Sequence, residues 1–174
     1  MFLKKEDGMN PFDFAMQLEK EGEKYYRELA EKTDNEGCRN IFNMLADDEV
    51  KHFNVFKGMK EGKTEDFPAT QVMEEARKTF QSFAEKGNPF EEEMSQKELY
   101  GKALEVEEKT RDFYLEKSEE TEDSREKELF RKIADEEQMH YNLIDELLGF
   151  IKEPETFLEN AEFFNSDDYW MMRR

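Results

Sequence analysis

The stretch DDEVKH at residues 47–52 decides the fold, and a near copy of it, DEEQMH, stands at residues 135–140. The chain has two histidines, His52 and His140, and each follows a glutamate by three positions. Residues three apart on an α-helix project from nearly the same side, so a carboxylate and an imidazole at this spacing can converge on one metal ion. The pair suits iron, manganese or zinc. The two Glu-x-x-His units therefore predict metal ligands on helices.

Chance is the alternative explanation for these motifs, because 33 of the 174 residues are glutamate. Residues 15–60, however, align with residues 103–148 at an offset of 88 without a gap. Matched pairs include Ala15 with Ala103, Glu19 with Glu107, Tyr26 with Tyr114, Glu49 with Glu137 and His52 with His140. Between these pairs, apolar residues tend to meet apolar residues. We infer an internal duplication of a helical hairpin, since chance glutamates do not explain a shared register of core and motif.

The composition favours one all-α domain over residues 1–174. Charged residues make up 41% of the chain, glycine and proline are scarce, and Phe (16) and Met (10) are plentiful. This profile is typical of long helices with charged outer faces rather than of disorder. The formal net charge of −19 predicts repulsion from nucleic acid and from anionic membrane surfaces, so neither is an expected partner.

Cys38 is the only cysteine, which excludes an intramolecular disulfide and a four-cysteine iron or zinc site. We expect it to be an ordinary helix residue. The first residues lack the apolar core of a signal peptide, and no run approaches the ~18 apolar residues of a membrane span. A cytoplasmic protein is therefore expected.

Capping signals and apolar stripes predict a four-helix bundle, built from hairpins at about 11–60 and 96–151 that a long crossover joins. Asn10-Pro11 should start a first helix that ends near residue 32, and the second should end near residue 59. Ser95-x-x-Glu98 is a capping box for the third helix, and Asp123 caps the fourth, which should end near residue 151. The crossover at 61–95 should hold a short helix capped by Thr70, and the tail at 152–174 another at about 155–163.

The register selects six candidate metal ligands. They lie on inward stripes and recur at the offset of 88: Glu19, Glu49, His52, Glu107, Glu137 and His140. A bundle that joins two Glu-x-x-His helices with one glutamate from each of two other helices can hold two metal ions. Glu19 and Glu107 would then be terminal ligands, while Glu49 and Glu137 would bridge. A buried ring of four carboxylates without cations would be costly, which favours two metal ions per chain.

Four further residues are candidates for supporting these ligands. Asp48 and Glu136 each precede a bridging glutamate and could orient the histidines through hydrogen bonds. We nevertheless expect both to be surface acids. Tyr26 and Tyr114 lie on the same helix faces as the terminal glutamates. We expect them to pack in the core, with a hydrogen bond to the site or an electron relay as the alternative.

The paired pattern Glu19…Glu49-x-x-His52 and Glu107…Glu137-x-x-His140 resembles the ferritin-like superfamily and, within it, the rubrerythrin di-iron domain. LEKEGEKYY at 18–26 and LADDEVKH at 45–52 are similar to segments of stand-alone rubrerythrin-like proteins. The resemblance covers roughly residues 10–150. It implies a ferritin-like four-helix bundle, a non-haem di-iron centre and the reduction of hydrogen peroxide to water.

The sequence departs from the rubrerythrin pattern in two ways. Rubrerythrins usually carry a rubredoxin domain with four cysteines, so a chain with Cys38 alone implies a separate electron donor such as rubredoxin. They also place a glutamate three residues after the third-helix ligand, where this chain has Thr110. A symmetric six-ligand site without that glutamate also resembles a ferroxidase centre.

Three functions stay open from the sequence. The first is a di-iron oxidoreductase that reduces hydrogen peroxide or dioxygen. The second is a ferroxidase or iron carrier, and the third is a metal-free helical interaction module whose apolar tail binds a partner. Manganese or a mixed metal pair would use the same ligands as iron. Aromatic residues in the tail and crossover predict self-association, and the resemblance implies a homodimer.

Overall fold

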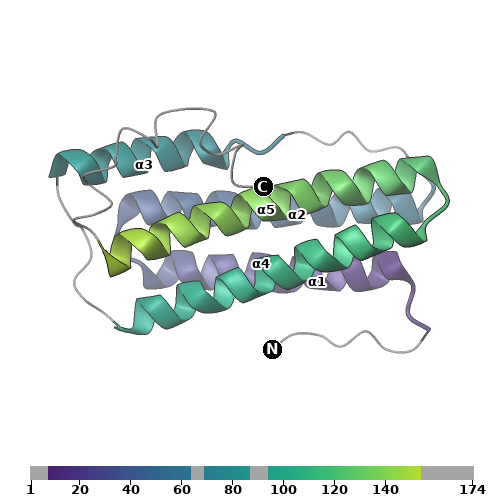
Figure 1. Ribbon diagram of the computed structural model, residues 1–174, viewed down its shortest axis with the longest axis horizontal. Coiled ribbons are helices and arrows are strands. Elements are labelled where there is room, and N and C mark those ends of the chain that lie inside the picture. The colour runs from purple at the N-terminus through teal and green to yellow at the C-terminus, as the bar shows by residue number, and fades with distance from the viewer. Residues whose placement is uncertain (1–7, 64–68, 87–93, 154–174) are drawn as a thin grey trace.

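The computed structural model describes residues 8–63, 69–86 and 94–153, which form five α-helices and contain no strand. The helices are α1 (Pro11–Lys32), α2 (Glu36–Lys60), α3 (Val72–Lys86), α4 (Met94–Glu120) and α5 (Ser124–Lys152). In Figure 1 the four long helices run alongside one another as a bundle, and the shorter α3 lies along one side of it. The predicted all-α four-helix bundle of two hairpins and a long crossover is confirmed.

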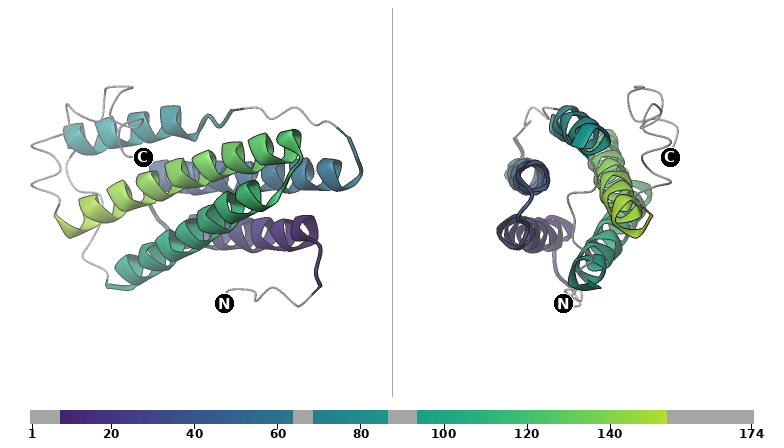
Figure 2. Two further views of the ribbon diagram at one scale, coloured as in Figure 1. Left: turned by 45° about the vertical axis from the view of Figure 1, so that its right-hand side comes forward. Right: turned by 90° about the vertical axis from the view of Figure 1, so that its left-hand side faces the viewer.

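The bundle consists of two helical hairpins. α1 packs chiefly against α2, and α4 packs chiefly against α5. The end-on view in Figure 2 shows these two pairs facing each other, with α3 beside α2 and α5. Phe83 of α3 stacks on Phe150 of α5 with ring centroids 4.8 Å apart, and Thr79 of α3 meets Gly37 at the start of α2. The crossover helix therefore covers the side of the bundle that α2 and α5 form.

Capping residues set where three of the helices begin. Asn10 Oδ1 accepts a hydrogen bond from Phe12 N, Asn35 Oδ1 accepts one from Cys38 N, and Asp123 Oδ1 accepts two from the first turn of α5. These bonds satisfy amide groups that a helix start leaves without an internal partner. The caps predicted at Asn10 and Asp123 are confirmed. The cap predicted at Ser95 is wrong, because α4 already begins at Met94.

Two apolar clusters flank a middle layer of the bundle. The first contains Tyr26, Ala46, Ala103 and Leu143, and the second contains Ala15, Val55, Tyr114 and Ala134. Each long helix contributes to both clusters, and the six candidate ligands fall between the two contributions in every helix. Apolar side chains thus close the candidate site above and below along the bundle axis.

Some expectations fall on residues that the structure does not describe. The tail helix at about 155–163 and the aromatic residues of the tail lie outside the described residues. Among the helices that are described, none is long and apolar enough to cross a membrane.

Candidate metal centre

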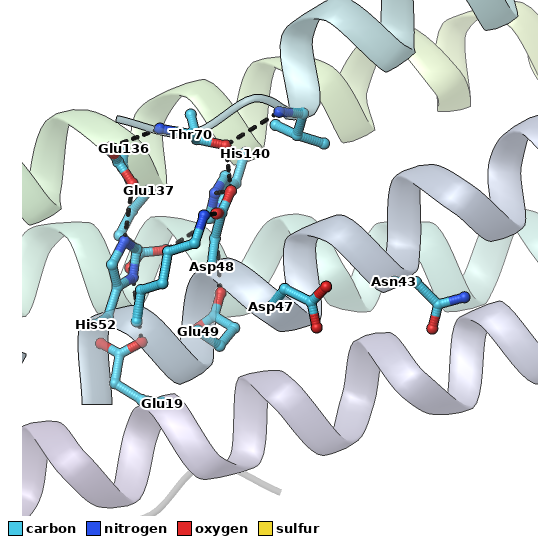
Figure 3. A network of polar contacts seen from close by, with 12 residues as sticks. Glu19, Asn43, Asp47, Asp48, Glu49, His52, Thr70, Glu136, Glu137 and His140 are labelled. Carbon is cyan, nitrogen blue, oxygen red and sulfur yellow. Dashed lines mark hydrogen bonds and ion pairs between the residues drawn. The ribbon is translucent and has the colours of Figure 1, made fainter. Parts of the chain in front are cut away.

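All six candidate ligands converge in the middle layer of the bundle. Glu19 comes from α1, Glu49 and His52 from α2, Glu107 from α4, and Glu137 and His140 from α5. Each side chain is buried, and the most exposed of the six, Glu49, has only 3% of its surface accessible. Figure 3 shows several of these side chains reaching from different helices toward one another.

The six residues form two overlapping groups, each of which could hold a metal ion. One group is Glu19, Glu49, His52 and Glu137, and the other is Glu49, Glu107, Glu137 and His140. Within each group, one potential ligand atom per residue lies within 4.8 Å of those of the others. Glu49 and Glu137 belong to both groups, as bridging ligands would. Each group adds one histidine and one glutamate of its own.

Gly22 makes room for one of the shared carboxylates. A Cβ atom at this position would lie 2.8 Å from Glu49 Oε2 and 2.9 Å from Glu49 Cδ. Real Cβ atoms essentially never approach that closely, so any larger residue would push the carboxylate aside. The glycine sits three residues after Glu19, one helical turn along α1, and its match in the repeat is the buried Thr110.

Each histidine turns one ring nitrogen toward the shared carboxylates. His52 Nδ1 lies 3.0 Å from Glu137 Oε1 and 3.3 Å from Glu19 Oε2. His140 Nδ1 lies 3.5 Å from Glu137 Oε2, 3.6 Å from Glu49 Oε1 and 3.8 Å from a carboxylate oxygen of Glu107. The rings face each other with centroids 5.8 Å apart. Nδ1 is therefore the nitrogen of each ring that is placed to bind metal.

The opposite ring nitrogens face Asp48 and Glu136, which we call the outer carboxylates. His52 Nε2 lies 3.0 Å from Glu136 Oε2, and His140 Nε2 lies 3.5 Å from Asp48 Oδ2. The expectation that these acids lie on the surface is wrong, since Asp48 is 2% exposed and Glu136 is 5% exposed. Tertiary packing buries them, because each acid points from its own helix toward the side of the bundle that α2 and α5 form. The crossover covers that side. There they can hold the imidazoles in the orientation that metal binding requires.

Two tyrosines hydrogen-bond to the site. The Tyr26 hydroxyl donates to Glu107 Oε1, and the Tyr114 hydroxyl donates to Glu19 Oε1. Both rings are almost fully buried, so the predicted core packing is present, but it is only part of their role. Each tyrosine orients the terminal glutamate of the opposite hairpin.

The polar contacts of the centre occur in pairs that follow the internal repeat of the sequence. Exchanging each residue for its match at the offset of 88 converts the Tyr26–Glu107 contact into the Tyr114–Glu19 contact. The same exchange converts the His52–Glu136 contact into the His140–Asp48 contact. Every one of these contacts joins one hairpin to the other. The duplicated hairpins thus build one centre with pseudo-twofold symmetry.

Sequence reasoning missed two contacts of Thr70, a residue predicted only as a helix cap. α3 begins at Val72, so Thr70 stands one residue before the N-cap position, but its Oγ1 accepts a hydrogen bond of 3.2 Å from Val72 N. Its hydroxyl also donates to Asp48 Oδ2, and its backbone N–H donates to Glu136 Oε1 at 3.3 Å (Figure 3). No local pattern signals these bonds, because they depend on how the crossover packs on α2 and α5.

Carboxylate crowding changes the acid–base behaviour of the shared glutamates. Burial, together with the nearby Glu137 and Glu19, raises the pKa of Glu49 well above its ordinary value. Burial and Glu137 likewise raise the pKa of Glu107. Burial also opposes the charged form of Glu137, but the imidazoles of His140 and His52 beside it outweigh this effect, and the pKa of Glu137 is lowered. These shifts favour the charged form at Glu137, one of the two carboxylates shared by both groups.

Neighbouring groups shift the pKa values of the two histidines and of Asp48 in the direction opposite to the shift that burial alone would cause. Burial disfavours the charged imidazoles, but the carboxylates around them, Glu19 first for His52 and Asp48 first for His140, raise the pKa of both rings well above the ordinary value. Burial also disfavours charged Asp48, yet bonds from His140, Lys51 and Thr70 lower its pKa to about 2. Without metal ions, protons on the buried glutamates and histidines would offset part of the negative charge of the centre.

The donor set fits metal cations. Glu107 Oε2 and His140 Nδ1 are buried and have no hydrogen-bond partner within the described part of the chain. Buried polar atoms without such a partner are rare and costly in native structures. Carboxylate and imidazole ligands at these atoms match the preferences of iron, manganese or zinc. A pair of divalent cations would satisfy these atoms and balance four buried carboxylates.

The fold and the site define a class: an all-α bundle of the ferritin-like type with a buried carboxylate–histidine centre. A family model described as Rubrerythrin matches residues 12–148, and the chain belongs to the rubrerythrin family. A search of curated proteins and a search of solved structures each found no match. The match spans the two hairpins and the crossover, and it includes all six candidate ligands.

Proposed function

We propose that this protein is a non-haem di-iron oxidoreductase of the rubrerythrin type. Its substrate in this proposal is hydrogen peroxide, or dioxygen, and its electrons come from a separate donor such as rubredoxin. The observation that carries the proposal is the sharing of Glu49 and Glu137 between two groups of four ligands, since shared carboxylates are what a pair of metal ions requires.

In this proposal Glu19 and His52 would hold one iron ion, Glu107 and His140 would hold the other, and both ions would share Glu49 and Glu137. When bound, a pair of ferrous ions supplies the two electrons that, with two protons, convert hydrogen peroxide to two molecules of water. Asp48 and Glu136 face Nε2 of each imidazole and would keep Nδ1 turned toward the shared carboxylates. Tyr26 and Tyr114 fix the terminal glutamates, and the two apolar clusters keep bulk water out.

The chain also supports a second candidate function, a ferroxidase or iron carrier in which iron itself is the substrate. The matched positions beside the centre are Gly22 and Thr110, and neither can supply a fifth carboxylate as a seventh ligand. The resulting six-residue centre is nearly symmetric, as a ferroxidase centre is. The two candidates differ in the fate of the iron after oxidation, because an oxidoreductase keeps its metal pair while a carrier releases it.

The experiment that separates the candidates loads the protein anaerobically with two ferrous ions per chain. Hydrogen peroxide is then added in repeated single equivalents with a chemical reductant and a ferric chelator present. The oxidoreductase proposal predicts repeated peroxide consumption with little iron reaching the chelator. Loss of the iron after one oxidation would favour the carrier, and consumption no faster than with free iron would contradict the proposed activity.

A further inference from the structure

Thr70 touches both outer carboxylates, although it belongs to neither hairpin. It lies two residues before α3, in the crossover, and its hydroxyl donates to Asp48 Oδ2. Its backbone N–H donates to Glu136 Oε1 at 3.3 Å. Asp48 and Glu136 in turn contact Nε2 of His140 and His52. One residue is thus connected to both halves of the centre.

The position of Thr70 is fixed by the packing of α3. The apolar face of this helix is buried against the bundle through Val72, Ala76, Phe80 and Phe83, none of them more than 3% exposed. Val72 N donates to Thr70 Oγ1, so the oxygen accepts from α3 while its proton points to Asp48. The hydroxyl therefore has one defined donor direction.

The two bonds of Thr70 are chemically different, and this difference breaks the symmetry of the centre. Only the bond to Asp48 depends on the side chain, whereas the bond to Glu136 comes from the backbone. Asp48 also receives Lys51 Nζ at 2.5 Å on Oδ1. The residue that matches Lys51 in the second hairpin is Met139, which cannot donate in this way. Among the described residues, the His140 half thus has side-chain donors to its outer carboxylate, Lys51 and Thr70, that have no counterpart in the His52 half.

We propose that Thr70 is a positioning residue whose hydroxyl acts, through Asp48 and His140, on one of the two metal ions. This inference rests on the proposed di-metal function. Removing an outer partner of a metal-binding histidine typically lowers metal affinity by about 10- to 100-fold. Removing the hydroxyl should therefore lower the affinity for the metal ion at His140 by about tenfold and change the affinity for the ion at His52 by no more than about twofold. The centre would then show one weak and one strong site.

The test titrates the metal-free protein with Co²⁺ under anaerobic conditions, following heat and the visible absorption of bound cobalt. Thr70→Val removes the hydroxyl at nearly constant shape, and Thr70→Ser restores it. In Thr70→Val, we expect one of the two cobalt ions to bind more weakly and the cobalt spectrum to change. In Thr70→Ser, both ions should bind as in the wild type. Thr79→Val, a change at a buried threonine within α3, is the control and should bind two ions normally.

A double-mutant cycle with Asp48→Asn tests the route of the effect. If Thr70 acts through Asp48, Thr70→Val should weaken binding little further in the Asp48→Asn background. Normal binding of two cobalt ions by Thr70→Val would overturn the inference and leave the proposed function standing. Equal weakening of both ions, or the same loss in Thr79→Val, would also overturn it, because a general packing defect would then explain the result. Failure of the wild-type protein to bind two ions would overturn the proposed function and the inference together.

Discussion

At the scale of single residues, Gly22 shows how closely the bundle packs around its carboxylates. A methyl group at Gly22 would need the space that Glu49 Oε2 occupies, 2.8 Å away. We predict that Gly22→Ala weakens metal binding by about tenfold, because the bridging carboxylate must move. Overpacking should also cost about 1–3 kcal/mol of unfolding free energy. Metal titration and urea unfolding of the variant measure both effects.

Gly101→Ala in α4 is the matched control for this prediction. A Cβ atom at Gly101 would meet nothing within 4 Å, so only the helix propensity changes. This variant should be more stable than the wild type by about 0.5–1 kcal/mol and should bind metal normally. Normal metal binding in Gly22→Ala would show that Glu49 is not held where the structure places it.

At the scale of helices, the polar contacts of the centre fasten one hairpin to the other. Tyr26 of α1 reaches Glu107 of α4, and Tyr114 of α4 reaches Glu19 of α1. Because each bond is buried and ends on a carboxylate, Tyr26→Phe and Tyr114→Phe should each lower the unfolding free energy by about 2 kcal/mol. Urea unfolding with a fixed metal content measures this loss.

Tyr141→Phe is the control for the tyrosine variants. Tyr141 also lies on a bundle helix, but its hydroxyl makes no hydrogen bond to the described residues, so the change should alter stability by less than about 0.5 kcal/mol. The repeat further predicts that Tyr26→Phe and Tyr114→Phe have effects of similar size. A loss in only one of the two would mean that the hairpins are not joined symmetrically.

Much of this arrangement could be predicted from the sequence, because it depends on local signals. Asn10 and Asp123 mark helix starts through their own side chains, and the offset of 88 selects six residues that do come together. The prediction that the outer carboxylates lie on the surface was wrong, since helix periodicity does not show which side of the bundle a crossover covers. Both are acids at matched positions of the repeat, Asp48 and Glu136, and this was the one available signal.

The remaining contacts could not be predicted because they join distant segments. The partner of each tyrosine depends on how far α1 is shifted along α4, which no single helix specifies. Thr70 reaches Asp48 and Glu136 only after α3 has packed on the bundle. The prediction for Ser95 was wrong for a simpler reason, because a capping-box pattern also fits the first turn of a helix that begins one residue earlier.

At the scale of the whole molecule, the centre predicts how stability depends on pH without metal. The pKa values of Glu49 and Glu107 are raised above the ordinary 4.5, and those of His52 and His140 above 6.5. The folded state therefore binds these protons more tightly than the unfolded chain. Their contribution to stability is complete below the ordinary values and is lost as pH rises through the raised ones.

We predict that the melting temperature of the metal-free protein falls as pH rises above the ordinary values of these glutamates and histidines. Metal ions replace the protons and bind more tightly as pH rises, so the loaded protein should not show this fall. Scanning calorimetry with and without metal measures the difference. In the metal-free protein, Glu107→Gln should make the melting temperature depend less on pH. This variant separates the effect of the raised pKa values from general charge repulsion. A metal-free melting temperature that rises over this range would contradict the prediction.

The measurement that tests the central claim most directly is the metal content per chain after anaerobic purification, determined by elemental analysis. The account predicts about two iron ions per chain in the wild type, because the residues form two groups of four ligands. It predicts almost none in Glu49→Gln combined with Glu137→Gln, and a normal content when the exposed Glu105 and Glu128 are changed instead. A wild-type protein with no metal and no uptake of added ferrous ion, or a double variant that keeps both ions, would contradict the account.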